Sequence, residues 1–416
     1  MKEGVQGNAY LPSRTRVLIS GTFDMGAHKD AEGADYARMS AAYFLYFVAF
    51  GLFVPYFPAY LRGRGLDAAA VGWFVALAPL ARVVVPPLVG LVADRHRGPR
   101  FWGAVCAWGG VAGLFVTASW PGRLVLLSGT FLFSAFTAPT IPLLDASAVR
   151  AGARRFGSIR RWGSLGYLLT SFGLGYFFPE LPGATVLFAL LGAHFLFAAY
   201  LSLPFGEEAT VSSVAWGDVR FFMRDARVLL LLSTLFLNRL ASAPFNGFYT
   251  LFVQDLGLSG RTVALTWGIA ITTEVAAMSF VDRALGRFGT PAVLAAGVGL
   301  EAARWLAYTS VRTEGGLLLL APLHGLAFAL LYVAGVRCVT EVVPAGLRSL
   351  GQGLSATAAG LGQAAGIVAA GYLYQGAGPP SMFAAAGAFG CLSLLSALLL
   401  GRVASGWSAP LERGNR

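Results

Sequence analysis

The chain contains twelve apolar stretches, each about as long as a helix that crosses a bilayer, and this pattern constrains its fold more than any other feature. Only 12% of the residues are charged, whereas a soluble chain has about 25%. Unbroken apolarity favours helices over barrel strands, which alternate and run to only about 10 residues. We therefore expect an all-α membrane protein with twelve transmembrane helices. The stretches lie at residues 41–61, 68–91, 101–119, 123–144, 161–178, 184–204, 228–252, 262–281, 291–310, 316–338, 349–373 and 381–402.

Arginine is distributed unevenly between the connections on the two sides of these spans. If both termini are cytoplasmic, the inner connections hold fourteen arginines and the outer ones hold five. Because cytoplasmic loops carry the excess of Lys and Arg, we expect a multi-pass protein of the cell inner membrane with both termini in the cytoplasm. The net charge of +11 then reflects topology and contact with the lipid bilayer. Basic residues are not interleaved with aromatics outside the membrane loops, so we expect no nucleic-acid partner.

Three short patterns recur about half a chain apart. Their offsets are 192, 188 and 188 residues, which predicts two copies of one six-helix bundle. The recurring patterns are GLDAAAV with GLSGRTV, ADRHRGPR with VDRALGRFG, and the pair Arg160 and Gly163 with Arg348 and Gly351.

The repeat divides the chain into five segments. Within the linker, apolar and basic residues separate onto two sides at helical spacing, which favours an interfacial helix, with a plain tether as the alternative. Met39 directly precedes the first span, so translation starts either at Met1 or at Met39. The expected segments are a polar, disordered cytoplasmic tail at 1–38, an N-terminal bundle at 39–204, a cytoplasmic linker at 205–227, a C-terminal bundle at 228–403 and a cytoplasmic tail at 404–416.

The connection GLVADRHRGPR at 90–100 is the most specific motif in the chain. It resembles the signature loop between the second and third spans of the major facilitator superfamily. Gly90 permits close helix approach, and Asp94 can accept hydrogen bonds from helix N-terminal amides or pair with Arg. We expect these contacts to lock one conformation; the alternative is a basic loop that only sets topology. The motif residues are Gly90, Asp94, Arg95, Arg97 and Arg100, and the second copy supplies Asp282, Arg283 and Arg287.

Further segments resemble the branch of this superfamily that contains the phenylpropionate permease, the lactose permease and the nucleoside symporters. The resemblance covers about residues 40–400. It implies two pseudo-symmetric bundles and secondary active transport by alternating access, commonly proton symport, with a site between the halves. The resemblance fixes neither the substrate nor the direction of transport. The matching segments are YFLYFVAFGLFVPYFPAYLRGRGL, PLLDA, FGSIRRWGSLGY, the Glu within 262–281, ARW at 303–305 and LHG at 323–325.

Glu274 is an acid within an otherwise apolar span. A lone charge in mid-membrane costs about 2.5 to 3.5 kcal/mol on insertion scales, so it should face a partner or a watery cavity. At about 1.5 Å per residue, Glu274 lies about 18 Å below the outer surface, against about 9 Å for Arg304, 14 Å for Glu301 and 12 Å for His324. We expect Glu274 to reach Arg304, with which Glu301 can also pair on one helix face. A structural ion-pair brace is the alternative.

In the lactose permease branch, the residues that resemble Glu274, Arg304 and His324 form the ligand and proton site. One position departs from that pattern: a second carboxylate follows the His by three residues in the permease, and here that position is Ala327. Proton coupling through that second carboxylate is therefore not expected in this chain. Glu274 or Glu301 is then left to hold the proton.

Asp145 and Arg160 resemble the branch's ligand-binding acid and arginine. They are expected to end one span and begin the next, either gripping a ligand or flanking the membrane as ordinary headgroup charges. By the offset of 192 residues, Arg82 is the repeat mate of Glu274, which suggests a cross-bundle pair or an anion-holding role.

Two more polar positions lie within spans. Arg239 belongs to a stripe of polar residues at helical spacing that includes Asn246, and such a stripe suits a cavity better than lipid. His194 lacks polar neighbours of this kind, so we expect a neutral, packed residue.

These observations predict a membrane transporter that works as a monomer. The excess of buried Arg over Glu favours an anionic or polar substrate. We expect proton-coupled symport of a small organic solute of the aromatic acid, sugar or nucleoside class. A drug or metabolite exporter working by proton antiport, or a non-transporting membrane sensor, is the alternative. An enzyme is not expected because the sequence lacks a cluster of nucleophile and base, and neither cofactor nor metal ligands are suggested.

Overall fold

The computed structural model describes residues 25–95, 98–119, 122–152, 156–203, 224–343 and 348–405, and every regular element in these ranges is an α-helix. Helices satisfy their own backbone hydrogen bonds, as the bilayer interior requires. The helices are α1 Met25–Gly63, α2 Ala68–Arg95, α3 Gly98–Ser119, α4 Arg123–Thr137, α5 Thr140–Gly152, α6 Phe156–Phe177, α7 Gly183–Leu201, α9 Ala226–Asp255, α10 Gly260–Phe288, α11 Thr290–Tyr308, α12 Glu314–Val342 and α13 Arg348–Ser405.

Two interruptions decide how these helices correspond to the expected spans. α4 and α5 follow each other across Ala138 and Pro139 and together cover one span. α13 is interrupted at Gly378, which adopts φ 78° and ψ 170° ahead of Pro379 and Pro380. Glycine accepts this positive φ, and proline suits the first turn of the helix that follows. The described helices are therefore consistent with twelve membrane crossings.

Nine helical segments of the described ranges are long and apolar enough to cross a membrane. α6 and α11 are not among them. Charged residues lower their apolarity, because α6 carries Arg160 and Arg161, and α11 carries Glu301 and Arg304. Composition alone thus underrates two helices that carry candidate site residues.

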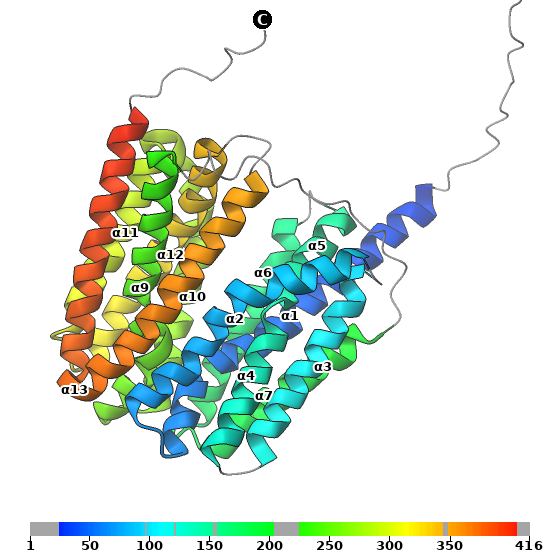
Figure 1. Ribbon diagram of the computed structural model, residues 1–416, viewed down its shortest axis with the longest axis horizontal. Coiled ribbons are helices and arrows are strands. Elements are labelled where there is room, and N and C mark those ends of the chain that lie inside the picture. The colour runs from blue at the N-terminus through cyan, green and yellow to red at the C-terminus, as the bar shows by residue number, and fades with distance from the viewer. Residues whose placement is uncertain are drawn as a thin grey trace, which may run out of the picture.

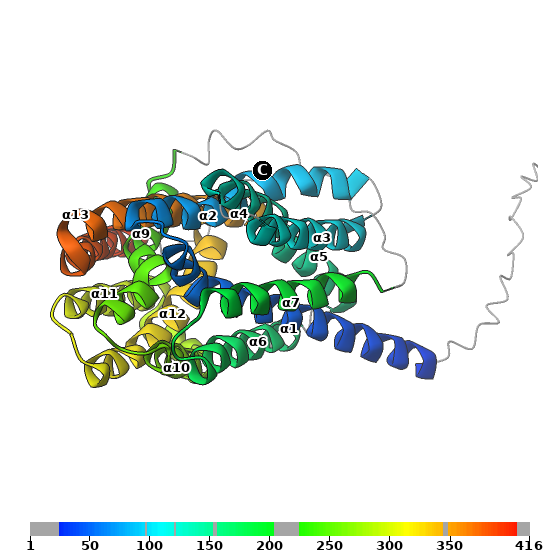
Figure 2. The ribbon, with the colours of Figure 1, turned by 90° about the horizontal axis from the view of Figure 1, so that it is seen from below.

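The helices form two bundles that lie side by side, α1–α7 in one and α9–α13 in the other (Figure 1). The bundles meet where α2 packs against α13 and where α6 packs against α10, as the view from below also shows (Figure 2). The all-α, two-bundle fold expected from the sequence is confirmed.

Two turns related by the repeat have the same geometry. Gly65, after α1, and Gly257, after α9, have φ of 80° and 72°. In each turn the glycine N–H donates to the carbonyl three residues earlier, at 2.9 Å, and the following leucine N–H donates to the carbonyl five residues earlier. This is the pattern of a helix that ends at a glycine in the left-handed region. The recurrence seen in the sequence therefore marks equivalent corners of the two bundles.

The bundles bind each other at one end of the molecule, where α1 is followed by α2 (the lower end in Figure 1), which we call the α1–α2 end. Arg62 forms an ion pair with Asp255 at 2.7 Å, and Tyr374 donates a hydrogen bond to the same carboxylate at 2.5 Å. The hydrogen bonds and ion pairs that we find between described residues of the two bundles all lie toward this end. They include Gly260 N–H to Pro179 O, Ala69 N–H to Gln375, Trp73 to Tyr372 and Thr250 to Pro55.

The structure corrects the expected N-terminal tail. α1 begins at Met25, so residues 25–38 are helical and not disordered. The Tyr200 hydroxyl donates a hydrogen bond to Arg38 O at 3.1 Å, which ties this extension to α7. Helix propagation from a packed segment costs little, and this explains how a polar sequence continues the helix. Residues 1–24, residue 204 and most of the expected linker, 205–223, lie outside the described residues, as do 406–416.

Candidate functional site

Asp145 of α5 and Arg160 of α6 lie together at the boundary between the bundles. Arg160 Nη1 is 3.8 Å from Asp145 Oδ1, and the Tyr43 hydroxyl donates a hydrogen bond to the same oxygen. The Arg160 guanidinium also lies 5.6 Å from the ring centroid of Tyr332 on α12, so it reaches the other bundle. The apolar span ends at Asp145, as expected, although the helix α5 continues to Gly152. The role of this pair toward a ligand stays a prediction.

Glu274 does not pair with Arg304. Its side chain is half-buried and forms neither a hydrogen bond nor an ion pair with any described residue. The charge that acts on Glu274 is that of Arg160, in the other bundle. The expected contact with Arg304 is wrong for this state of the protein, because Arg304 is enclosed within its own bundle. Glu274 is thus an acid at the bundle boundary that has no direct partner among the residues described.

α10 and α12 touch backbone to backbone at Gly325, immediately after His324. A Cβ at Gly325 would come within 2.1 Å of Ala270 O and 2.5 Å of Glu274 N. A methyl group cannot fit there unless the helices separate. The glycine of the LHG segment therefore sets the height of Glu274 relative to His324.

Gly325→Ala is expected to lower the stability of the protein by about 1 to 3 kcal/mol, the usual cost of overpacking. Gly315→Ala is the matched control, because Gly315 lies on the same helix and a Cβ there would meet nothing within 4 Å. Melting temperatures of the two variants in detergent check the prediction. Equal melting temperatures would contradict the close approach of α10 and α12.

Arg304 is completely buried in α11, with 0% of its side chain exposed, and Glu301 is its ion-pair partner at 3.6 Å. Asn238 of α9 donates a hydrogen bond to Glu301 Oε2 at 2.5 Å. No described residue accepts a hydrogen bond within 3.5 Å from the three guanidinium nitrogens. This ion pair lies inside the C-terminal bundle. It is the pairing on one helix face that the sequence predicted for Glu301 and Arg304.

An aromatic cluster that sequence analysis missed surrounds this arginine. The guanidinium carbon lies 4.0 Å from the ring centroid of Trp305, 4.8 Å from that of Phe245 and 5.9 Å from that of Tyr308. His324 joins the cluster with its ring centroid 4.9 Å from that of Phe245. Such contacts with aromatic faces help to offset the cost of burying the cation. The signal was available, since the sequence of α11 places Trp305 and Tyr308 beside Arg304.

Arg82 and Arg239 have no carboxylate partner in the part of the chain that the structure describes. Neither side chain forms an ion pair or a hydrogen bond with a described residue, and the cross-bundle pair of Arg82 with Glu274 is absent. The Arg82 guanidinium lies 5.0 Å from the ring centroid of Phe50, and that of Arg239 lies 5.9 Å from that of Phe328. Both cations therefore rest against an aromatic face.

Asn246 and Ala327, two further positions from the sequence analysis, lie within the C-terminal bundle. Asn246 donates a hydrogen bond to Gln363 Oε1 of α13 at 3.4 Å. Ala327, which stands where the lactose permease has a carboxylate, is only 1% exposed. A longer acidic side chain has no room at that position without repacking.

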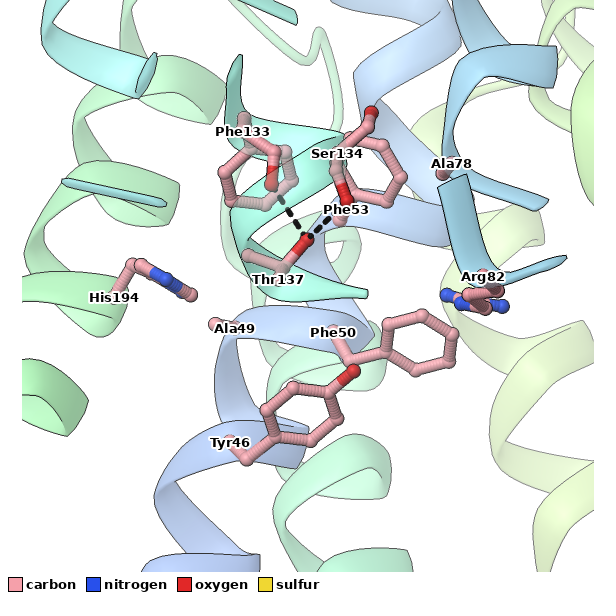
Figure 3. Close-up of a pocket in the computed structure, with 10 residues that line it drawn as sticks. All are labelled: Tyr46, Ala49, Phe50, Phe53, Ala78, Arg82, Phe133, Ser134, Thr137 and His194. Carbon is pink, nitrogen blue, oxygen red and sulfur yellow. Dashed lines mark hydrogen bonds between the residues drawn. The ribbon is translucent and has the colours of Figure 1, made fainter. Parts of the chain in front are cut away.

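A small cavity lies within the N-terminal bundle, between α1, α2, α4 and α7 (Figure 3). Its volume is about 20 Å³. Arg82 and His194 lie on opposite sides of it, with Tyr46 and Phe50 between them (Figure 3). His194 is 1% exposed and packs against the ring of Phe133 at 5.3 Å. The environment of His194 agrees with a packed residue.

The signature-loop residues lie at the opposite end of the molecule from the α1–α2 contacts. A Cβ at Gly90 would meet nothing within 4 Å, so the close helix approach expected there is wrong in this state. Arg97 and the side chains of Asp94 and Arg95 lie outside the described residues, and Arg100 lies in the first turn of α3. In the second copy, the residues Asp282, Arg283 and Arg287 are exposed, and Asp282 forms no ion pair with a described residue.

Two helical bundles joined at one end, with charged residues such as Arg160 and Glu274 within their spans at the boundary, define a membrane transporter of the major facilitator type. The model of the MFS_1 like family matches residues 36–385, and the chain belongs to this family.

Individual relatives agree with this assignment. A maltose permease from Geobacillus stearothermophilus is 31% identical over 281 residues, which is 64% of this chain and 69% of the permease. A probable 3-phenylpropionic acid transporter from Escherichia coli is 25% identical over 348 residues, 81% of this chain and 90% of that protein. The crystal structure of the nucleoside transporter NupG shares the fold, with a TM-score of 0.74 at 19% identity, covering 88% of this chain and 98% of NupG.

Proposed function

We propose that the protein is a secondary active transporter that carries a small organic solute together with protons across the cell inner membrane by alternating access. The relatives include proteins named for maltose, 3-phenylpropionic acid and nucleosides. These are all small organic solutes. They support the class of cargo without selecting one member.

One observation carries the alternating-access part of the proposal: the bonds between the bundles gather at the α1–α2 end. The positive-inside rule places that end outside the cell. At the other end, the acid of the second signature motif, Asp282, is exposed and unpaired among the described residues. This distribution matches a transporter whose bundles are held together at the outer end and are not held together by the motif contacts at the inner end. The opposite state requires the bonds at the α1–α2 end to break and the motif contacts to form.

Glu274 supports the proton-coupling part. A half-buried carboxylate in mid-span without a partner is costly while it is charged, and taking up a proton removes that cost. Arg160, whose charge acts on Glu274, sits on the other bundle, so movement of the bundles alters the environment of the acid. A change of protonation can therefore be linked to the change of state.

Transport in proteoliposomes tests the proposal. Purified protein is reconstituted, and uptake of labelled aromatic acids, sugars and nucleosides is followed with and without an imposed pH gradient, together with the internal pH. Uphill accumulation that acidifies the lumen is expected for at least one solute. Accumulation that makes the lumen alkaline indicates antiport, and binding without flux of any solute indicates a sensor. Either result overturns symport.

Asp255→Ala is expected to favour opening at the α1–α2 end, since the change removes both the ion pair with Arg62 and the hydrogen bond from Tyr374. An exposed ion pair contributes roughly 1 kcal/mol at most, so its loss should raise the ratio of open to closed molecules by up to about fivefold. Spin labels at Gly63→Cys and Ser259→Cys in a protein without other cysteines report the distance across this end.

Arg312→Ala is the control for this measurement, because Arg312 lies at the same end but donates its hydrogen bonds to carbonyls of its own bundle. Its distance distribution should match that of the parent protein. If Asp255→Ala also leaves the distribution unchanged, the ion pair does not contribute to closure.

A further inference from the structure

Three charged side chains remain deep in the described spans after the two internal ion pairs of the site are set aside: Arg82, Arg239 and Glu274. None of them forms an ion pair or a side-chain hydrogen bond with a described residue. With Glu274 ionised, two positive charges and one negative charge leave a sum of +1. The boundary therefore carries one positive charge that no described side chain neutralises.

The two arginines are held alike, one in each bundle. Arg82 on α2 lies over Phe50 of α1 at 5.0 Å, and Arg239 on α9 lies over Phe328 of α12 at 5.9 Å. An aromatic face occupies one side of a guanidinium and leaves its N–H donors, which point outward in the ring plane, free to bind. Guanidinium donors in this arrangement match the two oxygens of a carboxylate.

Both arginines lie near the boundary between the bundles. Arg82 precedes Val83, and a Cβ on Gly360 of the other bundle would lie 2.8 Å from Val83 Cγ2. Arg239 lies over Phe328, whose ring stacks at 5.9 Å on Tyr332, the ring that Arg160 of the other bundle contacts. A solute between the bundles can therefore approach Arg82 from one side and Arg239 from the other.

We propose that the transported solute is an organic monoanion with an apolar or aromatic body, and that Arg82 and Arg239 receive its carboxylate. This inference rests on the transport function proposed above and names its substrate class. A single negative charge neutralises the uncompensated +1, whereas a neutral sugar leaves it in place and a cation is repelled. Phe50 and Phe328, the half-buried rings that the two arginines contact, offer ring surfaces to the body of the solute.

Binding of matched acids and amides to the detergent-solubilised protein tests this proposal. The probes are benzoate, 3-phenylpropionate and hexanoate, each paired with its uncharged amide, with maltose and uridine as neutral solutes. Isothermal titration should give at least tenfold tighter binding for one or more acids than for the matching amide. Arg82→Gln and Arg239→Gln should each weaken acid binding at least tenfold and leave amide binding unchanged, while Arg82→Lys should retain part of the affinity.

Arg123→Gln is the control for loss of one positive charge, because Arg123 is an exposed residue at the start of α4. It should bind the acids as the parent protein does. If every acid binds no better than its amide, or if both Gln variants bind the acids normally, the monoanion proposal is wrong.

Transport measurements distinguish failure of the monoanion proposal from failure of the proposed transport function. Flux of maltose or uridine that none of the acids inhibits overturns the monoanion and leaves transport standing. Absence of flux and of binding for every probe overturns both.

Discussion

Glu274→Gln is expected to abolish the accumulation of solute driven by a proton gradient and to spare much of the exchange of solute across the membrane. Gln has nearly the shape of the protonated acid but cannot release a proton. Glu274 has no direct partner among the described residues, so its replacement breaks no ion pair, and binding of solute should survive. The expected effect is complete loss of uphill transport from one change of protonation chemistry.

Uptake and internal pH should be followed together in proteoliposomes. Glu180→Gln is the control, because Glu180 is an exposed acid in the connection between α6 and α7. It should accumulate solute like the parent protein. If Glu274→Gln still accumulates solute uphill with matching acidification, the proton is carried elsewhere, and Glu301 is the next candidate. Solute transport by the parent protein without proton movement would leave Glu274 a structural or ligand-binding role.

Glu301→Ala should lower the free energy of unfolding by about 3 to 5 kcal/mol, the range found when one partner of a buried ion pair is removed. The reason is that Arg304 has 0% of its side chain exposed, so its charge would remain buried without a counter-ion. Asn238 would also lose its acceptor. Surrounding aromatic rings offset only part of this cost, since one cation–π contact contributes about 0.5 to 2 kcal/mol.

A double variant distinguishes a structural pair from a functional one. Glu301→Leu combined with Arg304→Met removes both charges, and such replacements are often neutral for stability. Its melting temperature in detergent should lie closer to that of the parent protein than that of Glu301→Ala does. If the double variant also transports normally, the pair is only a brace.

An exposed ion pair supplies the control for these stability measurements. Arg337 and Glu341 lie 2.9 Å apart on α12, with 49% and 42% of their side chains exposed. Exposed pairs contribute about 0 to 1 kcal/mol, so Glu341→Ala should cost far less than Glu301→Ala. Similar losses of stability for the two variants would contradict the view that burial makes the removal of Glu301 costly.

The candidate site could be read only in part from the sequence. The recurrence of GLDAAAV as GLSGRTV predicted two copies of one bundle, and the first glycine of each copy, Gly65 and Gly257, adopts positive φ. The pairing of Glu301 with Arg304 followed from spacing on one helix. The contact of Glu274 with Arg304 was wrong, because depth along a span says nothing about the direction in which a side chain points around its helix.

The sequence by itself determined the class of fold, because long apolar segments in a bilayer must be helices and the helices must pack through their small and polar faces. It also determined which residues carry charge into the membrane. Only the tertiary structure decided which of those charges meet. Arg160 lies with Asp145 and over Tyr332 of the other bundle, while Arg304 is enclosed by rings and Arg82 meets no carboxylate among the described residues. The physical reason is that rotation of each helix about its axis is set by packing with its neighbours, and close contacts such as that at Gly325 are formed by residues distant in the chain.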